Sequence, residues 1–486
     1  MNYVFSFWAQ ETPLRTLRDT KVQIRFGVPI FTLMNNLPDI NLKKYLLHVP
    51  FVEKSMHKSL QTILFFSIAT IAAGILLLHF PTAHPVVVFG SVFIAASVLY
   101  AAMSWTLFRV DISEAVLLSI IAAAVVVRLS FIAGNPMGSE DAYRYIWDGK
   151  VQAHGINPYL YTALDPQLDS LHSPLLPSAM NHADLKTIYF PLTQWIFYCC
   201  YKLSGEALWG YKIVLLIAEI GTISALYIFL PLLSIPRKFT LLYAFCPLPI
   251  IEFAVDSHLD AVGLPLFLFS LLFFLKERKI LSYVLLGLSS SIKPVGLIVL
   301  PAMFFFEKGW RNKMFAFLIP LITVGVQFLP YLFTSNPFET LLSFTKDWSF
   351  NGVVFEAVYL YFRDNQFSRL ICGVILGIVI LLLNYKQKHF LDTVYFSLVA
   401  LILLSPVVHP WYVAWVAVLL PIERRWSGIA LAAGVSLTSF TVMNYRLTGD
   451  WEQYPVVLII EYLPMIVLLA VELRSHFSER REPSAV

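Results

Sequence analysis

Long apolar runs, separated by short polar and basic clusters, make up most of this 486-residue chain. An apolar run of about 20 residues is the length that crosses the hydrocarbon core of a bilayer as a helix. We therefore predict an all-α polytopic membrane protein with about 12–14 membrane segments. The predicted segments cover residues 60–80, 86–108, 112–133, 209–232, 239–253, 259–275, 314–333, 367–385, 390–408, 411–420, 428–444 and 455–472, with two further short helices between 280 and 307.

The apolar stretch between the basic clusters at Lys279 and Lys308 is too long for one span and too short for two. A hairpin of two short helices that turns at Lys293 and Pro294 fits this length. Broken helices of this kind are tolerated in membranes where they line a cavity enclosed by protein. Lys293 is therefore predicted to point at a polar site from within the membrane.

Basic clusters give the chain a consistent orientation. Loops rich in Lys and Arg stay on the cytoplasmic side of a membrane, and the basic segment at residues 1–57 is placed there as a lead-in. The third span then ends outside, so a long loop at residues 134–208 faces the extracytoplasmic side. Within that loop, residues 189–203 are apolar but too few to span, and we predict a helix lying in the membrane interface.

Composition agrees with a membrane protein and excludes other classes. Hydrophobic residues make up 58% of the chain, charged residues 14%, and the mean hydropathy is +0.70, which rules out a soluble globular domain. The net charge of +4 is spread over short clusters and gives no signal for nucleic-acid binding. The four cysteines show neither metal-ligand nor disulfide spacing.

The most polar motif of the chain runs over residues 138–160, just after the third apolar run, and reads GSEDAYRYIWDGKVQAHGINPYL. Ionisable groups beside hydrocarbon persist mainly where they face a cavity, a substrate or each other. A helix here would place Asp141 and Asp148 on one face, with Arg144 next to both Glu140 and Asp148. We select Asp141 as the candidate catalytic base and Glu140 as the second candidate. The plainer alternative is a solvated helix start, whose first-turn acids complement the helix dipole.

The motif SEDAYRYIWDGKVQAHGINPY, followed in order by YFPLTQ, SHLDA, SIKP and SPVVHPWY, resembles the membrane-embedded GT-C glycosyltransferases. It is most similar to bacterial polyprenyl-phosphate-mannose-dependent mannosyltransferases. The resemblance implies an all-helical fold, an acidic catalytic residue on the first external loop, and a lipid-phosphate donor that enters from the bilayer. The chain then divides into the lead-in at 1–57, two additional spans at 58–111, a GT-C-like domain at 112–474 and a cytoplasmic tail at 475–486.

Cations near the outer surface would stabilise a phosphate leaving group, as Arg and Lys do around phosphoryl oxygens. Arg144, Lys150 and Lys293 are the candidates, and Lys150 has the alternative of anchoring at the interface by snorkelling. Arg128, about six residues from the outer end of its span, is expected to snorkel in the same way. Glu219, in the middle of another span, is expected to bridge two helices.

SHLDA places His258 and Asp260 at a turn on the same side as Asp141. These two residues could bind acceptor hydroxyls, assist the base, or complete a metal site with Asp141. An Asp and a His two positions apart are a weak metal signal. No cofactor follows from the sequence, and a divalent cation is an open alternative.

Two aromatic motifs complete the candidate site. Tyr189 and Gln194 in YFPLTQ are candidates for contact with the sugar or the lipid headgroup. His409 and Tyr412 in SPVVHPWY are candidates for recognising sugar or phosphate, against the plainer interpretation of an interfacial aromatic belt. The substrate-binding candidates are Arg144, Asp148, Lys150, Tyr189, Gln194, His258, Asp260, Lys293, His409 and Tyr412.

We predict a glycosyltransferase of the bacterial cytoplasmic (inner) membrane, with its active site on the extracytoplasmic face. It would move a hexose, which the resemblance indicates is mannose, from a polyprenyl-phosphate donor to a glycolipid, polysaccharide or protein acceptor. A single carboxylate base predicts one inverting displacement. Two alternatives stay open, namely a transporter or flippase of lipid-linked sugars, and a glycan polymerase or ligase.

Overall fold

The computed structural model describes residues 50–386 and 389–478, so most of the predicted lead-in and most of the predicted tail lie outside the described residues. Within these ranges every regular element is a helix, and the chain forms no strand beyond isolated bridges of Val407 with Phe350 and Asn351. The predicted all-α fold is confirmed.

Seven helices among the described residues are long and apolar enough to cross a membrane, and a bent pair of helices is an eighth candidate. The seven lie in α2 (Pro50–Leu76), α3 (Pro85–Leu107), α7 (Trp209–Leu232), α13 (Trp310–Gly325) with α14 (Leu329–Leu332), α17 (Asn365–Lys386), α21 (Trp426–Gly434) with α22 (Ser439–Thr448), and α23 (Pro455–Ser478). The bent pair joins Arg237–Ala244 to Pro247–Val255 at 49°. The protein is therefore a multi-pass membrane protein.

The other predicted segments are helices shorter than a full span, so fewer helices are long enough to cross a membrane than the predicted 12–14 segments. They are α4 (Glu114–Leu129), α10 (Asp260–Leu275), α11 (Lys279–Ile292), α12 (Leu300–Phe306), α18 (Phe390–Leu404) and α19 (Pro410–Ala417). Proline delimits several of them, because its ring fixes φ and it lacks an N–H donor. Lys293 is extended after α11, and the 3-10 helix η6 (Pro294–Val299) begins directly after it, so the predicted hairpin is present.

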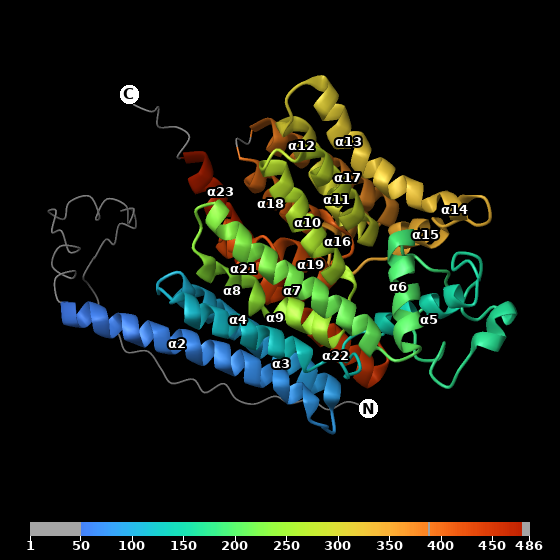
Figure 1. Ribbon diagram of the computed structural model, residues 1–486, viewed down its shortest axis with the longest axis horizontal. Helices are drawn as coiled ribbons and strands as arrows, with labels where there is room; N and C mark the ends of the chain where they lie inside the picture. The colour runs from blue at the N-terminus through green and yellow to red at the C-terminus, as the bar shows by residue number, and fades with distance from the viewer. Residues whose placement is uncertain (1–49, 387–388, 479–486) are drawn as a thin grey trace, which may run out of the picture. The chain divides into compact units, whose positions relative to one another are not determined.

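The loop between α4 and α7 carries two helices, α5 (Asp141–Ala153) and α6 (Pro191–Ser204), which pack against each other (Figure 1). A Cβ on Gly149 would collide with the Phe197 carbonyl, so only glycine allows this close approach. At 14 residues, α6 is too short to cross a bilayer. This length fits the helix predicted to lie in the interface.

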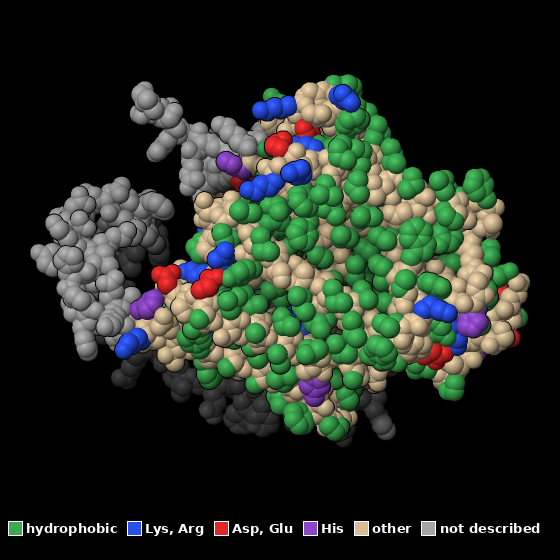
Figure 2. All heavy atoms as spheres, in the orientation of Figure 1, with side chains coloured by type: hydrophobic (Ala, Val, Ile, Leu, Met, Phe, Trp, Pro, Cys, Tyr) green, Lys and Arg blue, Asp and Glu red, His purple; other side chains and the backbone are tan. Residues whose placement is uncertain are grey.

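Hydrophobic side chains cover most of the middle of the face shown in Figure 2, and charged side chains gather towards its margins. Large apolar residues are widely exposed, as at Ile217 (64%) and Ile228 (58%) of α7. Contiguous apolar surface of this extent is rare on soluble monomers. This apolar surface is expected for a protein surrounded by lipid.

Arg128 of α4 and Glu219 of α7 form a buried ion pair, with 2.8 Å between Nε and Oε2. Arg128 also donates to the Ala244 carbonyl, and the Tyr243 hydroxyl donates to Glu219. The prediction that Glu219 bridges two helices is confirmed. The prediction that Arg128 snorkels is wrong, because the side chain is 2% exposed and makes these contacts inside the bundle.

Candidate active site

A cavity of about 1000 Å³ lies where α3, α5, α10, α19 and α22 meet the loops around them. Its volume is at the upper end of the range for small-molecule sites. Its walls come from distant parts of the chain, from Phe89 of α3 to Trp451, which follows α22. Eight of the twelve predicted site residues line it, namely Glu140, Asp141, Arg144, Tyr189, Asp260, Lys293, His409 and Tyr412.

Asp141 is the first residue of α5, where the helix dipole favours a negative charge. Its Oδ1 accepts a hydrogen bond from Asn181 Nδ2 at 2.8 Å, and the side chain is 21% exposed. Burial raises the pKa of Asp141 above its ordinary value, although the Asn181 bond and the charge of Lys293 act in the opposite direction. A carboxylate whose pKa is moved towards the working pH is suited to general base chemistry.

Glu140, the second candidate base, already has a cationic partner. Its Oε1 accepts a hydrogen bond from Arg446 Nη1 at 2.7 Å, across 306 positions of sequence. The predicted neighbour of Glu140 was Arg144, whose Nε lies 3.5 Å from Asp148 Oδ1. The i, i+4 contact of Arg144 with Asp148 is therefore confirmed, whereas the ion-pair partner of Glu140 is Arg446.

Asp256 fixes the backbone that leads into α5. Its Oδ1 accepts hydrogen bonds from the backbone N–H groups of Met137 and Gly138, at 2.7 and 2.8 Å. A Cβ on Gly138 would lie 2.5 Å from Asp256 Oδ2 and 2.7 Å from the Phe89 ring, so the approach requires glycine. Burial raises the pKa of Asp256 to about 6, against these two hydrogen bonds, which lower it.

His258 is fully buried beside Asp141. Its ring stacks on Trp411 with centroids 3.6 Å apart, and Trp411 also stacks on His409 at 4.4 Å. Burial and the charge of Lys293 hold the pKa of His258 well below its ordinary value and lower that of His409 to about 3. Both imidazoles are therefore neutral at physiological pH.

Lys293 supplies a cation to the cavity from the hairpin turn, as predicted. Its Nζ lies 3.1 Å from Asp260 Oδ2 and 3.8 Å from the centroid of the Tyr412 ring. Asp260 also accepts a hydrogen bond from Trp415 Nε1 at 2.7 Å. Three predicted site residues thus form one group, and the side chain of Lys293 keeps 18% exposure.

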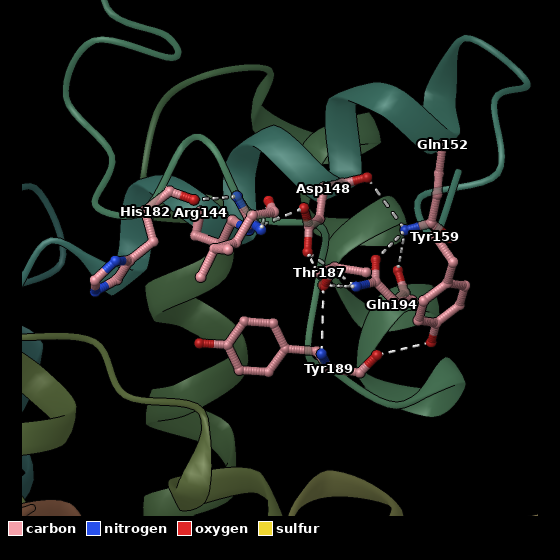
Figure 3. Close-up of polar contacts among 9 residues, drawn as sticks. Arg144, Asp148, Gln152, Tyr159, His182, Thr187, Tyr189 and Gln194 are labelled. Atoms are coloured by element: carbon pink, nitrogen blue, oxygen red, sulfur yellow. Dashed lines mark hydrogen bonds and ion pairs between the residues drawn. The ribbon is translucent and has the colours of Figure 1, made fainter. Parts of the chain in front are cut away.

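Asp148 and Gln194 lie outside the cavity lining, in a buried network that joins α5 to α6 (Figure 3). Asp148 Oδ2 accepts hydrogen bonds from Thr187 Oγ1 at 2.5 Å and from Gln194 Nε2 at 2.9 Å. Gln152 Nε2 donates to Gln194 Oε1 at 2.8 Å, which fixes the orientation of that amide. These contacts connect the two helices and the segment that carries Thr187.

Two other predicted residues differ in their relation to the cavity. Lys150 lies outside its lining and pairs with Glu206, with 2.6 Å between Nζ and Oε1. Tyr189 lines it, and its ring packs edge-on against Tyr145 at 5.1 Å. Lys150 thus ties α5 to the end of the loop, and Tyr189 contributes to the cavity wall.

The donor set for a metal is sparse in the part of the chain that the structure describes. No group of three or more His, Cys, Asp or Glu side chains there has the arrangement of a metal site. Asp141, His258 and Asp260, considered together from the sequence, do not form such a group.

Four cavity or near-cavity residues were not selected from the sequence: Asn181, Glu252, Asp256 and Arg446. Glu252 and Asp256 precede SHLDA closely, and that acidic turn was a usable signal. Asn181 and Arg446 come from a loop and a helix end without a motif. Only the fold brings them to Asp141 and Glu140.

Two family models match the chain. The one described as Alpha-(1->6)-mannopyranosyltransferase, N-terminal domain, matches residues 63–307, and the MptB C-terminal domain matches residues 365–474. The first match includes nearly all of the two spans that precede residue 112. Neither a curated protein nor a solved structure matches the chain.

Proposed function

The chain belongs to the alpha-(1->6)-mannopyranosyltransferase family, and from this premise we propose that it transfers mannose from a polyprenyl-phosphate donor to an extracytoplasmic glycan. Membership makes it a mannosyltransferase with a sugar donor and a glycan acceptor in a membrane. The donor, the mechanism and the face of the membrane are the proposal. The observation that carries it is the presence of Asp141 and Lys293 in one cavity, inside a multi-pass membrane protein.

In this mechanism Asp141 removes the proton from the acceptor hydroxyl as the oxygen attacks the anomeric carbon of mannose. The bond from that carbon to the phosphate oxygen breaks, and its electron pair leaves with the polyprenyl phosphate. Lys293 lines the same cavity, and in this proposal its charge stabilises the growing negative charge on that phosphate. Positioned carboxylates contribute about 100- to 10,000-fold in rate to such proton transfers.

The alpha-(1->6) linkage in the family's description limits which donor and which acceptor we propose. One displacement inverts the anomeric centre, so an α-linked product requires a β-linked mannosyl phosphate. A (1->6) linkage makes the acceptor group a 6-hydroxyl of a sugar, which favours a glycolipid or polysaccharide over a protein. Of the other carboxyl groups that line the cavity, Glu140 is paired with Arg446 and Asp260 with Lys293, and neither is proposed as a nucleophile.

The test uses purified protein in lipid vesicles, with radiolabelled polyprenyl-phosphate mannose and a mannose-containing glycolipid acceptor. Wild type and Glu140→Gln should form product, and Asp141→Asn should lose about 100- to 10,000-fold in rate. Digestion by an α-mannosidase should release the label. Equal transfer by Asp141→Asn would overturn the choice of base, and transfer from a nucleotide sugar alone would overturn the donor. Movement of the donor across the membrane without product would indicate a transporter.

A further inference from the structure

The turn between η5 (Ile250–Val255) and α10 places a histidine between two carboxyl groups. His258 Nδ1 lies 3.8 Å from Asp141 Oδ2, and His258 Nε2 lies 3.3 Å from Glu252 Oε2. Neither ring nitrogen makes a hydrogen bond that meets geometric criteria, although the ring is fully buried. Glu252 lines the cavity and is 3% exposed.

The backbone of this turn is specialised for bringing Glu252 and His258 together. η5 is a π-helical turn, a rare element that often occurs at functional sites. Ser257 then adopts a left-handed conformation with φ of 70°, which is strained for a residue with a side chain. The backbone N–H of His258 donates to the backbone carbonyl of Glu252 at 2.9 Å, so the polypeptide folds back onto itself.

Hydrogen-bond capacity limits the protonation states of these three groups. A neutral imidazole has one N–H donor and one acceptor nitrogen, whereas ionised carboxylates only accept. His258 is neutral, so two ionised carboxylates would leave its acceptor nitrogen facing a negative charge. A continuous series of hydrogen bonds from Glu252 through His258 to Asp141 therefore requires a proton on one of the two carboxyl groups.

We propose that Glu252 carries this proton, fixes the tautomer of His258, and thereby directs the His258 Nδ1–H to the Asp141 carboxylate. Glu252 and His258 are then positioning residues, and Asp141 remains the ionised base. Catalytic hydrogen bonds are often long in unliganded structures and tighten with substrate, which accounts for the 3.8 Å separation. The proposal rests on the proposed function, because it needs Asp141 as the base.

Other charged and titratable groups also face His258 and Glu252. None of them is changed in the variants below, so each variant is compared with wild type in the same charged surroundings. They are Lys293 and His409 beside His258, and Asp256 and Asp260 beside Glu252.

His258→Phe tests the donor while keeping a ring to stack on Trp411. We expect kcat to fall about tenfold with unchanged KM for both substrates. We also expect the acidic limb of kcat/KM to move up by about one pH unit, because the ionised form of Asp141 loses a hydrogen bond. The matched control is His84→Phe, at an exposed histidine that caps α3 without a side-chain hydrogen bond. A wild-type rate and pH profile for His258→Phe would overturn the proposal.

Glu252→Gln and Glu252→Met test which group holds the proton. Gln has the size of Glu and can donate to His258 Nε2 as a protonated Glu does, so it should keep kcat within about threefold, whereas Met should lose about tenfold. Equal losses in both variants would overturn the proposal, because Glu252 would then act as a carboxylate. Activity in Asp141→Asn would instead refute the proposed base, so the two failures are distinguishable.

Discussion

Asp148→Asn distinguishes a structural role for the network of Asp148, Thr187 and Gln194 from the substrate contact predicted from sequence. The carboxylate is 3% exposed, accepts two hydrogen bonds and lies beside the Arg144 guanidinium. The Asn amide would turn an N–H₂ donor towards Arg144, so a buried charge loses its partner. Breaking a buried ion pair by removing one partner is destabilising by about 3–5 kcal/mol. Arg144 keeps the Leu185 carbonyl at 2.5 Å, so we expect the lower end, about 3 kcal/mol.

The assay measures the free energy of unfolding in mixed detergent micelles, together with transfer by the folded protein. Asp148→Asn should lower stability while kcat of the folded fraction stays within about threefold of wild type. Gln194→Leu alone and with Asp148→Asn completes a double-mutant cycle, in which residues of one network couple by about 0.5–3 kcal/mol. Asp169→Asn is the matched control, because its side chain is 67% exposed. Wild-type stability with a raised donor KM would refute the structural role and restore substrate contact.

Three further changes test other parts of the site. Asn181→Ala removes a hydrogen-bond donor that favours the ionised form of Asp141, so the pKa of Asp141 should rise. The acidic limb of the pH profile of kcat/KM should then move to higher pH. An unchanged acidic limb would contradict this role of Asn181. Lys293→Met should lower kcat, measured from initial rates, by about 100- to 1000-fold. Lys293→Arg keeps the charge and should lower kcat by a smaller factor. Unchanged rates in Lys293→Met would exclude the role of Lys293 in stabilising the leaving group. Gly138→Ala should destabilise by about 1–3 kcal/mol, with Gly134→Ala as control because its Cβ meets ordinary contacts of 3.4 Å or more.

Local sequence patterns predicted the helices. They also led to the selection of Asp141, Asp260 and Lys293, all of which line the cavity. Apolar length and proline positions are properties of short segments, and they placed the hairpin at Lys293 correctly. Arg128 was misjudged, because its distance from a span end says nothing of a partner 91 positions away.

The sequence also could not show which side chains of the polar motif point into the cavity. Asp148 and Lys150 belong to the same polar motif as Asp141, yet neither lines the cavity, because Asp148 pairs with Arg144 and Lys150 with Glu206. Charge alone does not reveal which face of a short helix meets the cavity. The approach of Glu252 to His258 needs a π-helical turn and a left-handed Ser257, neither of which had a signature in the composition.

The cavity is lined by residues from early and late parts of the chain, so it can form only after most of the chain has been synthesised. Glu140 and His258 leave the ribosome before Arg446 and Trp411, which are their ion-pair and stacking partners in the finished cavity. Ionisable groups without partners are costly within a membrane, and the early part of a chain folds first. A nascent chain interrupted before residue 410 would therefore hold these ionisable groups without the partners that the rest of the chain supplies.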